Sequence, residues 1–216
     1  MIHAYDELYL EKAQNALGGM LDYAVNDVGY RIEEFWSLFL SSAICSDFEN
    51  GDCSILVGRS GIELAYEVLD SKKNNVQPSN RDMRSEEYWT GWALAYFQWQ
   101  YALAFRDITE FIPIEEIRAM YMPFHEMDIR QFCDRMSEMY LERRKETNLK
   151  RRRKRLGYSQ SALAAETGIP VRTIQQYEQG QKDINKARAE YVIRLSKVLF
   201  CEAQSLLEPI RKPLTP

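Results

Sequence analysis

Apolar residues recur at helical spacing along most of this 216-residue chain. Over residues 5–25 they stand three and four positions apart, which predicts an amphipathic helix. The same spacing predicts further helices at about 30–46, 61–70, 86–105, 114–121 and 126–145. No segment alternates apolar and polar residues with the period of two that is typical of a half-buried strand. We therefore expect residues 1–146 to form an all-α domain.

Polar residues and glycines indicate where these helices begin or weaken. Ser60 stands three positions before Glu63, the capping-box spacing in which each side chain binds the other residue's backbone N–H. Gly18 and Gly19 predict a weak point, and so a kink, in the first helix. The longest loop is expected at 71–82.

The segment 86–105 follows the N-cap candidate Ser85 and is apolar on nearly every face, which is typical of a central helix. Its aromatic residues are Tyr88, Trp89, Trp92, Tyr96, Phe97, Trp99 and Tyr101. We expect these side chains to form core. The alternative is that they line a ligand pocket.

Five short helices are expected in the last third of the chain, at 149–156, 160–167, 171–179, 186–199 and 202–208. Thr147 and Ser159 are candidates for N-caps, and Gly157, Gly168 and Gly180 each stand just past a helix end. The pattern leaves open whether the helix at 126–145 continues into the helix at 149–156.

The second and third of these helices are separated only by Gly168, Ile169 and Pro170. So short a link keeps the two helices from lying side by side, and they must cross at a steep angle, as in a helix-turn-helix. A small core would then be closed by Leu156, Leu163, Ala164, Ile169, Ile174, Tyr177, Leu195 and Leu199. The outward face of the third helix would carry Val171, Arg172, Thr173, Gln175 and Gln176, which suit the edges of DNA bases.

Charge is divided unequally along the chain. Residues 1–147 hold 14 Lys and Arg against 26 Asp and Glu, a balance of −12, and residues 148–216 hold 14 against 6, a balance of +8. The two balances together give the formal net charge of −4. The split favours two domains, 1–146 and 147–216, of which the basic one faces a polyanion. Because a helix directs its side chains all round, at most half of the six basic residues at 150–155 can face one groove of DNA.

Other classes of protein find little support in the composition. The four cysteines form no C-x-x-C pair and the two histidines are far apart, so we expect neither a zinc site nor another metal, and no cofactor. Motifs of phosphate-binding loops, zinc proteases and serine hydrolases are absent from the sequence, so we expect no enzyme. No apolar run reaches the roughly 18 residues of a membrane span. We expect a soluble, cytoplasmic protein.

Residues 148–208 resemble the XRE (Cro/cI-like) helix-turn-helix family. The resemblance rests on Ser159-Gln160, Leu163-Ala164, Gly168, Ile174, Tyr177-Glu178 and Gly180, which stand in register with the right gaps. It implies that residues 147–216 form a five-helix, lambda-repressor-like domain that binds double-stranded DNA.

The resemblance also implies roles by position. Gln160 would bind a phosphate or a neighbouring base. The base-contacting positions of the third helix would be Val171, Arg172 and Gln176, with Thr173 near the DNA backbone. Phosphates would be contacted by Asn185 and Lys186. The family's interhelix ion pair would be formed by Arg153 and Glu178, in a structural role.

Two positions depart from the family pattern. Phe200 stands where a glycine or asparagine normally ends the fourth helix, and a left-handed backbone would strain a phenylalanine there. Pro170 replaces the commoner Ser or Thr cap of the third helix, which therefore loses a side-chain cap.

These inferences together predict a sequence-specific, DNA-binding transcriptional regulator that acts as a repressor. A single module offers few base contacts, so we expect a homodimer, with the dimer contact in the fifth helix and C-terminal tail or in the N-terminal domain. The alternative is an antitoxin, whose acidic N-terminal domain neutralises a partner toxin while the basic domain represses their operon. The acidic domain would in either case bind a partner or effector, or another copy of itself.

Overall fold

The computed structural model describes residues 3–70, 76–79 and 84–210. The chain divides into two compact units, Met1–Tyr140 and Leu141–Pro216, which we describe separately. The described residues form helices joined by turns and contain no strand, so the prediction of an all-α fold is confirmed. The boundary expected at residue 146 lies inside the second unit.

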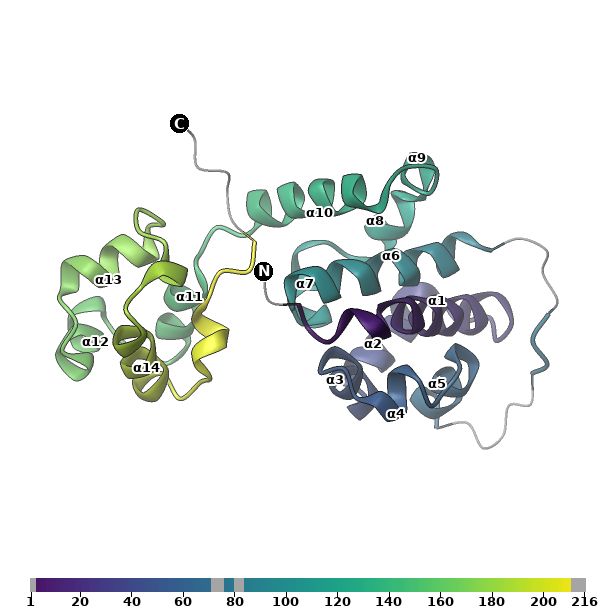
Figure 1. Cartoon of the computed structure of the whole chain (residues 1–216), viewed down its shortest axis with the longest axis horizontal. Coiled ribbons are helices and arrows are strands. Elements are labelled where there is room, and N and C mark those ends of the chain that lie inside the picture. Colours follow the sequence, from purple (N-terminus) through teal and green to yellow (C-terminus); the bar gives the residue numbers. More distant parts are fainter. Residues whose placement is uncertain (1–2, 71–75, 80–83, 211–216) are drawn as a thin grey trace. The chain divides into compact units, whose positions relative to one another are not determined.

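The N-terminal unit is built from short and long helices in succession (Figure 1). Its elements are η1 (Glu7–Tyr9, a 3-10 helix), α1 (Leu10–Asn26), α2 (Ile32–Ser41), α3 (Ala43–Glu49), α4 (Cys53–Leu56), α5 (Gly61–Val68), α6 (Glu86–Tyr101), α7 (Phe105–Phe111), α8 (Ile114–Ala119), α9 (Tyr121–Phe124) and α10 (Ile129–Arg143). The last helix, α10, continues past the division at Tyr140.

Helices α1 and α6 lie side by side and form the centre of this unit (Figure 1). A Cβ atom on Gly18 of α1 would lie 2.8 Å from the carbonyl oxygen of Tyr88, and one on Gly91 of α6 would lie 2.5 Å from that of Leu17. Glycine is therefore required where the two backbones meet. The weak point predicted at Gly18 and Gly19 does not interrupt α1, which is one continuous helix, and Gly18 serves close packing.

Two predicted helices are interrupted by the backbone. Segment 30–46 is divided into α2 and α3 at Ser42, which is extended (ψ 156°) and caps α3 by accepting a backbone N–H at 3.4 Å. Segment 86–105 ends as α6 before Ala102, whose φ of +48° is left-handed, and α7 begins separately. Of the loop expected at 71–82, only 76–79 belongs to the described residues, and it has no regular structure.

The N-caps predicted at Ser60 and Ser85 agree with the structure. Ser60 and Glu63 form the capping box of α5, and Ser85 caps α6 through the N–H of Tyr88 at 3.0 Å. The aromatic residues of α6 divide into a buried group, which includes Trp89, Phe97 and Trp99, and a half-buried group, Tyr88, Trp92, Tyr96 and Tyr101.

The C-terminal unit contains α11 (Asn148–Arg155), α12 (Gln160–Thr167), α13 (Val171–Glu178), η2 (Ile184–Lys186), α14 (Ala189–Val198) and η3 (Ala203–Leu206). Thr147 caps α11, accepting the N–H of Lys150 at 3.3 Å, and the residues between Arg143 and Asn148 are not helical. Helices α10 and α11 are therefore separate. The helix predicted at 202–208 is instead a 3-10 helix of four residues.

The core of this unit lies between its short helices and is formed by apolar side chains. It includes Leu149, Leu163, Ala164, Ile169, Ile174, Tyr177, Ile184, Leu195, Leu199 and Leu206. The prediction that Leu156 joins this core is wrong, because its side chain is 39% exposed. Leu156 follows the last residue of α11, where the chain turns away at Gly157 (φ +73°), and Leu149 at the start of the helix is buried instead.

Candidate nucleic-acid interface

The turn between α12 and α13 is formed by three residues. Gly168 has a left-handed backbone (φ +67°), which glycine adopts without strain. Ile169 is 1% exposed and anchors the turn in the core, and Pro170 fixes the backbone just before α13. The end of α12 is also held by Arg194 of α14, which donates to the Thr167 carbonyl at 3.3 Å. The turn is therefore rigid, and it fixes how α13 leaves α12.

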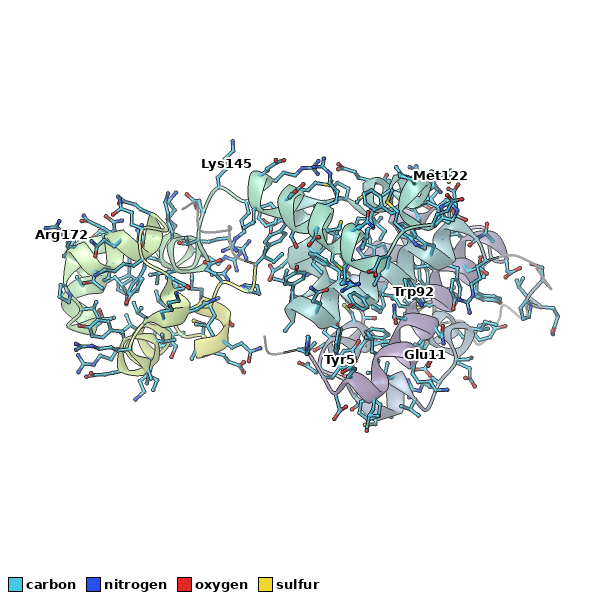
Figure 2. All side chains as sticks on the ribbon, turned by 45° about the horizontal axis from the view of Figure 1, so that its top comes forward. Tyr5, Glu11, Trp92, Met122, Lys145 and Arg172 are labelled. Atoms are coloured by element: carbon cyan, nitrogen blue, oxygen red, sulfur yellow. The ribbon has the colours of Figure 1, made fainter. Side chains whose placement is uncertain are left out.

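Helix α13 has one buried and one outward face. Ile174, Tyr177 and Glu178 are buried, whereas Arg172 is exposed and directed away from the body of the unit (Figure 2). The positions between them, Val171, Thr173, Gln175 and Gln176, are half-buried. No side chain caps α13, and the carbonyl oxygen of Pro170 accepts the N–H of Thr173 at 2.8 Å.

A buried ion pair holds α13 against α11. Nε of Arg153 donates to Oε1 of Glu178 at 2.6 Å, and Nη2 donates to Oε2 at 2.8 Å. Nη1 of Arg153 donates to the Tyr158 carbonyl at 2.7 Å, so the guanidinium is satisfied on three sides. The carboxylate of Glu178 raises the pKa of Arg153 by accepting these hydrogen bonds. The structure thus places the two residues of the expected ion pair together.

Gln160 joins this pair to the outward surface. Its Nε2 donates to Oε2 of Glu178 at 2.7 Å, and its Oε1 accepts from Nε2 of Gln175 at 3.5 Å. Because a carboxylate only accepts, the amide of Gln160 has one orientation, with its nitrogen toward Glu178. Gln160 and Gln175 are half-buried, and they bring the start of α12 to the face of α13.

Asn185 and Lys186 lie on η2 and differ in what they contact. Lys186 is exposed. The side chain of Asn185 instead exchanges hydrogen bonds with the backbone of Glu208: Nδ2 donates to its carbonyl at 2.6 Å, and Oδ1 accepts its N–H at 2.8 Å. The resemblance assigns Asn185 to phosphate, and the structure uses its amide to hold the C-terminal segment.

Glu208 is a residue whose role the sequence pattern missed. Its carboxylate pairs with Nη1 of Arg144 at 2.6 Å and accepts the N–H of Asn148 at 2.7 Å, while Asn148 donates to the Leu207 carbonyl at 2.6 Å. These contacts connect residues that lie far apart in sequence, so no local motif signals them. They hold the segment after η3 against the start of α11.

The basic run at 150–155 is mainly structural. Arg153 belongs to the buried ion pair, and Arg152 donates to the carbonyls of Leu199 at 3.1 Å and Phe200 at 2.7 Å, which closes the end of α14. Lys150 and Lys154 both contact the carboxylate of Glu146. Lys154 and Arg155 are exposed, so they are candidates for DNA contacts together with the exposed cations of α13 and η2.

Two of the four thiols, those of Cys45 and Cys133, are buried. Burial raises the pKa of Cys133 to about 12 and also raises that of Cys45. Cys53 is exposed and Cys201 half-buried, and all four thiols are free.

None of the helices in the described part of the chain is both long and apolar enough to cross a bilayer.

These features define the C-terminal unit as a helix-turn-helix domain. In a comparison with protein families, residues 149–206 match the model of a helix-turn-helix family, and the domain is of the XRE type. Domains of this type occur in DNA-binding transcription regulators. The match begins after Arg144 and Asn148 and ends before Glu208, so of these partners of Glu208 only Asn185 lies within it. No curated protein and no solved structure was found to match the chain.

Proposed function

We propose that the protein is a sequence-specific transcriptional repressor that places α13 in the major groove of DNA. Arg172 and Gln176 hydrogen-bond base edges, for which guanine and adenine are the preferred partners, and Val171 contacts a thymine methyl group. Thr173 lies near the DNA backbone, Gln160 binds a phosphate or a neighbouring base, and Lys186 binds a phosphate. Asn185 keeps its amide on the backbone of Glu208 and so positions the turn that carries Lys186.

The observation that carries this proposal is the outward face of α13 on a rigid support. Recognition of base edges requires side chains held to within a fraction of an ångström, and a helix fixed by buried contacts supplies that precision. The ion pair of Arg153 with Glu178 and the hydrogen bond from Gln160 hold the helix from behind. The exposed side of the helix stays free of them.

The proposed active form is a homodimer. One helix-turn-helix contacts only a few base pairs, and two related α13 helices would enter successive major grooves about 34 Å apart. A dimer on its operator represses transcription by occupying DNA that the polymerase needs.

A selection from a pool of randomised duplexes tests this proposal. We expect the full-length protein to enrich a sequence with two related half-sites about 10 base pairs apart. Enrichment of a single half-site would contradict the dimer. A pool that stays random over successive rounds, with the protein retained on every duplex equally, would contradict sequence-specific binding.

A second proposed function, the antitoxin, is favoured by the charge division. Residues 1–147 carry a balance of −12, which suits a basic protein partner as much as it suits solubility. Co-expression with the product of the adjacent gene, followed by size-exclusion chromatography, distinguishes the two. A stable complex that relieves toxicity supports the antitoxin, and separate elution of the two proteins contradicts it.

A further inference from the structure

The N-terminal unit has a hollow of about 290 Å³ that the DNA-binding proposal does not use. It lies beside α6 and α9, and aromatic side chains make up most of its wall. The residues that matter for its chemistry are Arg84, Tyr88, Trp89, Trp92, Tyr121 and His125. Ligand pockets in proteins measure about 300–1,000 Å³, so this volume suits a small molecule.

The aromatic wall is held in place from behind. Trp89 packs edge-to-face against Tyr121, with ring centres 5.7 Å apart, and against the fully buried Phe132 at 5.3 Å. The hydroxyl of Tyr88 donates to Oδ1 of Asn15 at 2.8 Å. These three rings are therefore fixed before any ligand arrives, which lowers the entropy lost on binding.

The surface of the hollow that a ligand would touch is formed by half-buried rings. Tyr88, Trp92 and Tyr121 each remain partly exposed, although aromatic side chains of this size gain free energy when fully buried. A planar, apolar ring of a ligand would complete the burial of these side chains and could stack on Trp92, because Tyr88 already carries Arg84 on one face and Tyr121 already stacks on His125. Trp92 is labelled in Figure 2.

Charge then selects the kind of planar molecule. The guanidinium carbon of Arg84 lies 4.6 Å above the centre of the Tyr88 ring, and the side chain is exposed. Among residues 3–70, 76–79 and 84–210, the structure gives Arg84 no carboxylate partner. A guanidinium over an aromatic wall repels an organic cation and binds a carboxylate through its paired N–H groups.

His125, the other basic side chain of the hollow, is the second group to consider. Its Nδ1 lies 3.0 Å from the Tyr121 carbonyl oxygen, which can only accept, so Nδ1 carries a proton. Its Nε2 lies 3.7 Å from a carboxylate oxygen of Glu126. Arg84, which is always protonated, is therefore the permanent cation of the hollow that a ligand anion would meet.

We propose that this hollow binds a small aromatic carboxylic acid. The ring of the acid lies against Trp92 and Tyr88, and its carboxylate pairs with Arg84. The site belongs to the N-terminal unit alone and does not depend on whether the C-terminal unit binds DNA.

Isothermal titration calorimetry on the full-length protein tests the site. The probes are benzoate and indole-3-carboxylate, compared with cyclohexanecarboxylate, which lacks the aromatic ring, and benzyltrimethylammonium, which has the opposite charge. We expect saturable binding of at least one aromatic acid with one site per chain, and at least tenfold weaker binding of the two comparison compounds. Failure of both aromatic acids to bind at millimolar concentration overturns the proposal, as does tighter binding of the cation.

Three variants identify the site. Arg84→Gln removes the cation from an exposed position, and Trp92→Phe keeps an aromatic ring of smaller area, so both are expected to fold. We expect Arg84→Gln to weaken binding at least tenfold and Trp92→Phe to weaken it severalfold. The matched control, Arg135→Gln, changes an exposed arginine of α10 outside the hollow and should leave the affinity unchanged. Equal affinity of Arg84→Gln and the wild type overturns the proposal.

Discussion

Arg153 of α11 and Glu178 of α13 form a bidentate ion pair whose two side chains are 10% and 1% exposed. The same carboxylate also receives the amide of Gln160, so one buried acid connects three helices of the domain. A buried ion pair costs desolvation free energy, and this cost is offset only when every polar atom finds a partner. The pair is therefore a point at which small changes have large effects.

Replacing one residue of this pair should lower the free energy of unfolding of the C-terminal unit more than replacing both. Arg153→Met leaves a buried carboxylate without its cation and should cost about 3–5 kcal/mol, whereas the double variant Arg153→Met/Glu178→Leu should recover most of that loss. Urea denaturation followed by far-ultraviolet circular dichroism measures both. All four tryptophans lie in the N-terminal unit, so their fluorescence serves as an internal control and should not change. A double variant no more stable than the single one would contradict this interpretation.

The contact between α1 and α6 makes a second prediction. In Gly91→Ala the new methyl group would lie 2.5 Å from the carbonyl oxygen of Leu17, so the helices must separate, at a cost of about 1–3 kcal/mol. Gly19→Ala is the matched control, because its nearest neighbour is Gly61 at 3.6 Å and alanine favours a helix. Tryptophan fluorescence during denaturation reports both variants. If the two alanines have the same effect, close approach does not explain these glycines.

Stability of the N-terminal unit should respond to pH with opposite signs at Glu49 and Glu87. Burial raises the pKa of Glu49, although its carboxylate accepts the N–H of Phe105 at 2.5 Å. Burial also acts to raise the pKa of Glu87, but hydrogen bonds from Asn26 and others and the charge of Arg118 outweigh it and lower the pKa overall.

The signs follow from these two directions. Because the folded-state pKa of Glu49 is raised, its contribution to the free energy of unfolding falls as pH rises above the unfolded pKa of about 4.3. Glu49→Gln should therefore gain stability relative to the wild type as pH increases. Because the folded-state pKa of Glu87 is lowered, its carboxylate stabilises the fold above the unfolded pKa, and this contribution disappears as pH falls. Glu87→Gln should therefore be least stable relative to the wild type at neutral pH. Denaturation between pH 4 and 7 measures both differences, and parallel pH profiles for the two variants would contradict these assignments.

Phe200 offers a test of backbone strain in the C-terminal unit. Its φ is +49° and its side chain is 77% exposed, so the residue bears the strain of a left-handed backbone without burying its ring. Phe200→Gly should stabilise the unit by about 1 kcal/mol, since a left-handed L-residue costs roughly 1–2 kcal/mol and glycine does not pay it. Phe200→Ala keeps the strain and should give no such gain in the same thermal melt. A gain of equal size in both variants would assign the effect to the exposed ring instead.

Local chemistry explains how much of the fold was predictable. Ser60, Ser85, Thr147 and Ser159 cap helices within three residues of themselves, and Gly168 ends α12, so the chain around each position is enough to locate it. The helix-turn-helix was predictable because its spacing and its apolar residues agree.

Long-range contacts explain what was missed. Glu208 acts on Arg144, Asn148 and Asn185, which no pattern places near it. The breaks at Ser42 and Ala102 and the exposure of Leu156 depend on how the chain turns between helices, and apolar spacing alone does not record this. In the candidate interface, sequence located the residues of α13 but not the use of Arg152 as a helix-end contact.

A titration of DNA with paired variants tests whether α13 recognises sequence. The selected operator and a scrambled duplex are titrated with the wild type, with Arg172→Ala/Gln176→Ala, and with the control Lys197→Ala, which removes an exposed cation of α14. Two salt concentrations separate base contacts from phosphate contacts. We expect the wild type and control to prefer the operator, and the α13 variant to lose about 1–3 kcal/mol per base contact and approach its affinity for the scrambled duplex. Equal, strongly salt-dependent binding of all three proteins to both duplexes would contradict recognition by α13.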